Sequence, residues 1–220
     1  MRPAISAFAL AACVVAAALC PSIPRAAAAP PLKTLAPSHT IERVPFVRQQ
    51  ANGCGAAALE SVLRHYGLAA SQRDIERDVA LPNGEILNLD LKLYARRNGL
   101  RAESRRGDAT LLKAWIARDV PVICQVRLGG IEAPRNHFVV VFGYDDRKLV
   151  LVAHTGDRAA EQLSYLDFAS AWRDAQNWML VIRPPARADL DQSGPPAPPI
   201  AEAAKAEADH PEASPGASAE

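Results

Sequence analysis

The order of helical and extended patterns along this 220-residue chain predicts an α+β fold, with helices first and an antiparallel sheet after them. In the first half, apolar side chains recur at helical spacing, as at Leu59, Val62 and Leu63. From about residue 120 onward, short runs of β-branched and aromatic residues alternate with turns, which is typical of antiparallel strands. The chain does not alternate strand with helix, so a parallel sheet is not expected.

Helix boundaries follow from local start and stop signals. Ser71 and Asp108 are expected to cap helix N-termini, because their side-chain oxygens can accept hydrogen bonds from free backbone N–H groups. Asn88 is the expected cap of a further helix, and Gly67 and Gly99 are expected stops. The sequence therefore predicts helices over residues 53–66, 72–79, 89–98 and 109–118.

The sheet is expected to centre on residues 137–144, because this mostly apolar run suits a strand that is covered on both faces. Residues 145–147 are expected to form the hairpin turn after it. An extended segment is expected at 41–47, where Pro45 suits an edge strand or a lead-in to the sheet. Further strands are expected at residues 100–105, 120–128, 149–153, 161–164 and 177–183, and a helix at 167–174.

The first 29 residues have the features of a secretory signal peptide. Arg2 gives a positive start, an apolar run follows at 4–20, and the alanines at 26–29 offer a cleavage site. We therefore expect an exported protein, periplasmic or secreted. An uncleaved N-terminal anchor is one alternative. The run that ends at Cys13 also resembles a bacterial lipoprotein box, and lipidation there would attach the protein to a membrane.

The composition predicts the remaining organisation. Residues 30–40 are expected to form a linker, 41–185 the folded domain, and 186–220 a disordered tail, because the tail is rich in Pro, Ala, Ser and Glu and poor in large apolar residues. A net charge of +1 argues against nucleic acid as a partner. Neither a glycine-rich phosphate loop nor a metal-type Cys/His spacing is found, so no cofactor and no metal are expected. A monomer is expected.

Cys54 is the first candidate for chemistry. It lies between two glycines at the start of the first expected helix, where the helix dipole lowers the pKa of a thiol and favours the thiolate. The alternative is a buried cysteine without a chemical role. Cys124 lies in an apolar strand and is expected in the core, although an exported protein could also join the two cysteines in a disulfide.

His137 is the candidate base. It follows a loop and opens the most apolar strand, a position from which a rigid sheet could hold it towards a helix start. His39 and His210 lie in the expected linker and tail. His65 is on the same helix as Cys54, about 16 Å further along the axis, and cannot reach the thiol.

Two groups of motifs carry a family resemblance. Val-Pro-Phe-x-x-Gln at residues 44–49 precedes Cys-Gly-x-Ala-x-Leu at 54–59, and His-Phe-Val-Val at 137–140 precedes Gly-Tyr-Asp at 143–145. Together they resemble the C39-type, bacteriocin-processing-like cysteine peptidases in a free-standing exported form, from about residue 41 to residue 185. The resemblance implies a papain-like fold, with the nucleophile at a helix start packed on the sheet, and a peptide or protein substrate.

The resemblance also implies the roles of individual residues. Cys54 would be the nucleophile and His137 the general base. Gln49 would supply a donor to the oxyanion together with the Cys54 backbone N–H, and Gln50 is the fallback for that role.

The third member of the site departs from the family pattern. The family usually places an aspartate after the strand that follows the histidine strand, whereas this chain has His154 there. We expect His154 to orient the base by accepting a hydrogen bond from it. Asp157, three residues on, is the alternative carboxylate.

Three functions remain open from the sequence. The first is peptide-bond hydrolysis through a thioester at Cys54. The second is another acyl transfer on the same fold, of the amidase or transglutaminase kind, which would use the same two residues with a different acceptor. The third is a peptide-binding relative with impaired catalysis, which the histidine in place of the carboxylate would favour.

Overall fold

The computed structural model describes residues 35–83, 85–129 and 134–185. The expected signal peptide and the expected tail lie outside these residues. Within them are α1 (Cys54–His65), α2 (Gln72–Val79), α3 (Asn88–Arg97), α4 (Ala109–Ile116) and α5 (Tyr165–Asp174). The strands are β1 (Ser38–Thr40), β2 (Arg101–Arg106), β3 (Val122–Leu128), β4 (Arg135–Asp145), β5 (Val150–His154), β6 (Glu161–Ser164) and β7 (Trp178–Arg183).

The described strands form one sheet in the order β2-β7-β3-β4-β5-β6, and β1 pairs with β4 outside this path. Every pairing is antiparallel. The α+β fold is therefore confirmed, with helices before most of the sheet. β4 is the central element, because it pairs with β3, β5 and β1.

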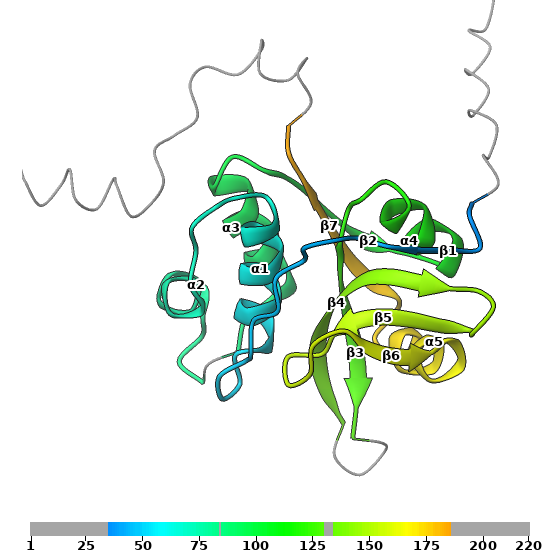
Figure 1. Cartoon of the computed structure of the whole chain (residues 1–220). Coiled ribbons are helices and arrows are strands. Elements are labelled where there is room, and N and C mark those ends of the chain that lie inside the picture. The colour runs from blue at the N-terminus through cyan, green and yellow to red at the C-terminus, as the bar shows by residue number, and fades with distance from the viewer. Residues whose placement is uncertain (1–34, 84, 130–133, 186–220) are drawn as a thin grey trace, which may run out of the picture. The chain divides into compact units, whose positions relative to one another are not determined.

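The helices pack around this sheet (Figure 1). α1 contacts β4, α2 and α3. α5 lies after β6 in the chain and contacts β3, β5 and β6. The side of α1 that faces the sheet is apolar, since Leu59, Val62 and Leu63 are fully buried. The start of α1 is thereby fixed relative to β4, and this arrangement positions the site described below.

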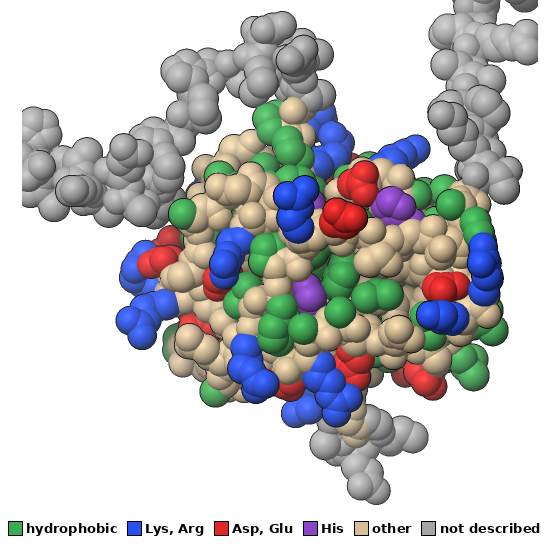
Figure 2. Space-filling model, viewed as in Figure 1, with side chains coloured by type: hydrophobic (Ala, Val, Ile, Leu, Met, Phe, Trp, Pro, Cys, Tyr) green, Lys and Arg blue, Asp and Glu red, His purple; other side chains and the backbone are tan. Residues whose placement is uncertain are grey.

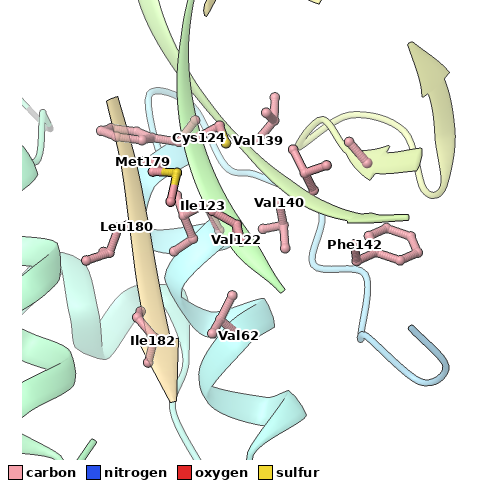
Figure 3. Close-up of a cluster of buried hydrophobic side chains, with 14 of the residues drawn as sticks. Val62, Val122, Ile123, Cys124, Val139, Val140, Phe142, Met179, Leu180 and Ile182 are labelled. Carbon is pink, nitrogen blue, oxygen red and sulfur yellow. The ribbon is translucent and has the colours of Figure 1, made fainter. Parts of the chain in front are cut away.

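The central strands and α1 share one hydrophobic core (Figure 3). Val62 of α1, Val122 of β3 and Ile182 of β7 all belong to it, and Cys124 lies opposite Met179 where β3 pairs with β7. Cys124 is fully buried, as expected of a core residue, and both described cysteines are free thiols. The alternative of a disulfide between Cys54 and Cys124 is therefore wrong.

Local signals predict most helix ends correctly. The side chains of Ser71 and Asp108 accept hydrogen bonds from the backbone N–H groups of Asp74 and Leu111, as N-caps do. Asn88 is not a cap. It is the first residue of α3, and its side chain exchanges two hydrogen bonds with the amide of Gln125 on β3.

Two further boundaries differ from expectation. The expected linker contains β1, whose backbone extends the sheet along the end of β4. Gly143 lets β1 pass closely, because a Cβ there would lie 2.8 Å from Thr40 Oγ1. The expected extended segment at 41–47 belongs to no strand of the sheet. α5 begins at Tyr165, earlier than expected, because Ser164 caps it by accepting from the Asp167 N–H.

None of the helices in the described ranges has the length and hydrophobicity needed to span a bilayer.

Candidate active site

Cys54 is the first residue of α1. Gly53 precedes it as the N-cap, without a side chain that could bond to the free N–H groups of the first turn. These N–H groups and the helix dipole create a positive potential at the thiol. The side chain is half-buried and lines a groove at the surface.

His137 reaches this thiol from β4. Its backbone lies opposite Val126 of β3, so both strands fix the position of its Cα. The imidazole is hydrogen-bonded to the side chain of Cys54. Its Nε2 lies 2.8 Å from the backbone oxygen of Thr155 and donates to it, which leaves Nδ1 for the thiol. The structure thus brings Cys54 and His137 together, as expected.

The electrostatics favour charge separation between the two side chains. Burial alone would raise the pKa of Cys54, but hydrogen bonding to His137 and to the backbone of Phe138, together with the charge of His137, brings that pKa below its ordinary value. Burial alone would lower the pKa of His137, but its bonds to Cys54 and Thr155 and the negative charges of Cys54 and Asp157 raise that pKa. Opposite shifts of this kind stabilise a thiolate–imidazolium pair.

His154 does not orient the base, in contrast to the sequence-based expectation. It is buried, its Nε2 lies 3.0 Å from the Val44 carbonyl oxygen, and its Nδ1 accepts from the Ala160 N–H at 3.1 Å. Both ring nitrogens are thus engaged by backbone groups. Burial lowers the pKa of His154, which keeps the ring neutral. The expectation fails because a carbonyl, not a side chain, accepts from His137.

Asp157 contacts the other candidate residue, Gln49. Nε2 of Gln49 lies 3.2 Å and 3.3 Å from the two carboxylate oxygens of Asp157 and donates to them. The backbone N–H of Gln49 also donates to the carbonyl of Gly156, at 2.9 Å. The carboxylate therefore holds the amide of Gln49 and contributes its charge to His137, while Thr155 fixes the ring.

Gly156 is needed for this contact. It has a φ of +82°, and a Cβ there would lie 2.5 Å from Oε1 of Gln49. A side chain at this position would therefore displace the Gln49 amide. Gln50, the fallback donor, is exposed, and its described hydrogen bonds are made by its backbone: the N–H donates to Oε1 of Gln72, and the carbonyl accepts from the Gly53 N–H.

The groove beside Cys54 has a volume of about 1550 Å³, more than a single small molecule requires. Gln49, His137 and Asp157 line it together with Cys54, and residues of α3, β3, β6 and α5 also line it. In Figure 2, hydrophobic side chains gather near the centre of the face in view, and many charged side chains lie towards its outline.

Two partners in the site could not be identified from the sequence. Thr155 acts through its carbonyl, which every residue possesses. Gln72 bonds to the backbone around Gln49 from a different helix. Among the described residues there is no group of three or more His, Cys, Asp or Glu side chains that could hold a metal ion.

Comparison with known proteins agrees with this geometry. The family model of the peptidase C39 family matches residues 43–186. No curated protein matches the chain.

Solved structures share the fold. The peptidase domain of Streptococcus ComA, a bifunctional ABC transporter, is 24% identical with a TM-score of 0.54, over 65% of this chain and 100% of that one. A C39-like peptidase from Bacillus anthracis is 15% identical with a TM-score of 0.56, over 68% and 99%. A double glycine motif protease from an AMS/PCAT transporter, solved with its leader peptide, is 22% identical with a TM-score of 0.54, over 67% and 99%. At these identities the likeness establishes the fold.

Proposed function

Because this chain belongs to the peptidase C39 family and is a cysteine peptidase, we propose that it hydrolyses a peptide bond through a thioester at Cys54, with His137 as the acid and base. The observation that carries this proposal is the hydrogen-bonded pair of Cys54 and His137, with opposite pKa shifts, at a helix start in an open groove.

In the first step, the thiolate of Cys54 attacks the carbonyl carbon of the scissile bond and a C–S bond forms. The carbonyl oxygen becomes an oxyanion, which the Cys54 backbone N–H and the Gln49 amide would stabilise. Imidazolium His137 then gives its proton to the leaving amine as the C–N bond breaks.

In the second step, neutral His137 removes a proton from water, which attacks the thioester carbon. The carboxylate product leaves and the proton returns the pair to its charged state. Throughout, the carbonyl of Thr155 accepts from Nε2, so the ring keeps the orientation in which Nδ1 faces the sulfur. A backbone carbonyl thus takes the orienting role that a side chain has in a catalytic triad.

We further propose that the protein acts outside the cytoplasm on a peptide or protein. The support is the sequence of the N-terminus, where Arg2 precedes an apolar run and alanines at 26–29 offer a cleavage site. These residues lie outside the described part of the chain. The alternative form of this proposal is an exported protein attached to a membrane by a lipid on Cys13. Mass measurement of the mature N-terminus distinguishes a chain that starts after residue 29 from one that starts at a lipidated Cys13.

A peptide-library digest in H₂¹⁸O, analysed by mass spectrometry, tests the chemistry. We expect new C-termini that carry ¹⁸O, absent with Cys54→Ala. Glycinamide is added in a parallel reaction. If products accumulate as glycinamide adducts and few ¹⁸O-labelled acids form, the protein is an acyltransferase. If wild type and Cys54→Ala give the same products, Cys54 is not the nucleophile.

A further inference from the structure

Buried polar side chains gather around one irregular segment, residues 44–50, which we call the lead-in segment. In the described part of the chain, the buried polar or charged residues are Glu60, Ser61, Gln72 and His154. Three of them bond directly to the backbone of the lead-in segment. Since burial of polar groups is costly unless they are paired, this concentration indicates that the segment has to be held in one conformation.

Gln72 makes the contacts closest to Gln49. Its Nε2 donates to the carbonyl oxygen of Arg48 at 2.7 Å, and its Oε1 accepts from the backbone N–H of Gln50 at 3.0 Å. The side chain therefore holds the backbone groups on both sides of Gln49. The two bonds also fix the orientation of the Gln72 amide, because a flip would place donor against donor and acceptor against acceptor.

Gln72 is in turn tied to the helix that carries the nucleophile. Its backbone N–H donates to Oε2 of Glu60 on α1 at 2.7 Å. A Cβ on Gly53 would lie 2.9 Å from Oε1 of Gln72, so the amide also packs against the residue before Cys54. Gln72 thus contacts both segments that flank the oxyanion position, namely the start of α1 and the backbone of Gln49.

We propose that Gln72 is a positioning residue, which acts through Gln49 to hold the oxyanion-stabilising amide beside Cys54. The inference rests on the proposed function, in which Gln49 donates to the oxyanion. Gln72 does not contact the Cys54–His137 pair through any described hydrogen bond, so its loss should affect steps that form an oxyanion and spare steps that do not.

Two small probes separate these steps in the full-length protein. p-Nitrophenyl acetate acylates Cys54: a C–S bond forms to the acetyl carbon, an oxyanion develops on its oxygen, and p-nitrophenolate leaves and is measured. Iodoacetamide alkylates the same thiolate by displacing iodide and forms no oxyanion. Both probes are small, so neither depends on the unidentified peptide sequence.

We expect Gln72→Ala to slow acylation by p-nitrophenyl acetate about 10- to 100-fold, as a misplaced catalytic group does. Alkylation by iodoacetamide should not change. Gln49→Ala should slow acylation about 10²–10³-fold, as removal of one oxyanion donor does. The double variant should be no slower than Gln49→Ala, because Gln72 then has no amide to position.

Ile75→Val is the matched control. Ile75 is fully buried on the same helix, so the substitution perturbs α2 and leaves the hydrogen bonds of Gln72 intact. It should leave both rates unchanged. Gln72→Met serves if Gln72→Ala does not fold: it keeps the length of the side chain, adds no charge beside Cys54, loses both bonds to the lead-in segment, and should also slow acylation alone.

The outcomes distinguish the two proposals. If Gln49→Ala leaves acylation unchanged, the oxyanion role in the proposed function is wrong. If Gln49→Ala slows acylation but Gln72→Ala behaves as Ile75→Val does, the positioning role is overturned. A Gln72 variant that slows alkylation as much as acylation also overturns it, because the effect would then act on the Cys54–His137 pair.

Discussion

The strand that carries His137 and the segment that carries Gln49 are held in place by different interactions. β4 pairs with β3 over residues 135–141, His137 included, and with β5 from Val140 onward. The lead-in segment belongs to no strand, and the side chains of Ser61, Gln72 and His154 hold its carbonyls. Cys54 resembles His137 in this respect, because the regular backbone of α1 holds it.

This difference predicts how the two parts of the site respond to substitution. A sheet ladder is maintained by many backbone bonds, so changes in single side chains leave the position of His137 intact. Apart from the backbone bonds of Gln49 to Gly156 and of Gln50 to Gly53, the lead-in segment depends on a few long-range side-chain bonds, and each of these can be removed by one substitution. The positions of Cys54 and His137 should therefore be robust to substitution elsewhere, and the position of Gln49 should be sensitive to remote changes.

The largest effect is expected from removal of His137, the proposed base. His137→Ala should lower the rate of peptide hydrolysis by about 10²–10⁴-fold, because neither proton transfer nor thiolate stabilisation remains. The rate is measured on a peptide identified by the digest. His65→Ala is the control, since His65 lies at the other end of α1 and bonds to the Arg43 carbonyl. Equal losses in both variants would contradict the assignment of the base.

A smaller effect should follow from crowding the Gln49 amide. Gly156→Ala places a Cβ where Oε1 of Gln49 lies and should slow acylation by p-nitrophenyl acetate by up to about 10²-fold. Gly67→Ala is the matched control, because Gly67 has a φ of +79° and no neighbouring atom within 4 Å of an added Cβ. Both variants place an alanine at a positive φ and so carry the same backbone strain. If both lose acylation rate equally, the loss comes from reduced stability and not from displacement of Gln49.

Local patterns in the sequence predict the elements that carry Cys54 and His137. Helix starts at Ser71 and Asp108 depend on bonds to residues three positions on, which a sequence shows directly. The run at 137–144 is apolar because residues 138–144 of β4 are all buried. The prediction for Asn88 is wrong because its side chain bonds to Gln125, a residue 37 positions away.

The contacts around Gln49 could not be predicted in the same way. The place of His154 directly after the expected strand at 149–153 predicts that it orients His137, but its ring is engaged by Val44 and Ala160. Gln72 follows a helix cap, where a polar residue is ordinarily solvent-exposed. Both assignments depend on which backbone carbonyls the fold brings within hydrogen-bond distance, and no residue type signals that.

The smallest expected effect is on stability and its pH dependence. His154→Phe should lower the free energy of unfolding by about 1–3 kcal/mol, because the Val44 carbonyl and the Ala160 N–H lose their partner. The pKa of His154 is lowered in the folded protein, so its contribution is present above the ordinary histidine pKa and is lost as the pH falls below it. The free energy of unfolding in urea is measured for wild type and variant from pH 7.5 down to pH 5. The difference between the two proteins should become smaller as the pH falls. A difference that widens in acid would contradict the neutral, doubly bonded ring.

The charged state of Cys54 and His137 is tested most directly by the pH dependence of Cys54 alkylation. Iodoacetamide labelling is followed by mass spectrometry, with buried Cys124, whose pKa is raised by burial, as the unreactive internal reference. In the wild type, labelling should titrate below the ordinary thiol pKa of 9.0. In His137→Ala, burial remains without the imidazolium, and the midpoint should move above that value. The same midpoint in both proteins would contradict the thiolate–imidazolium pair.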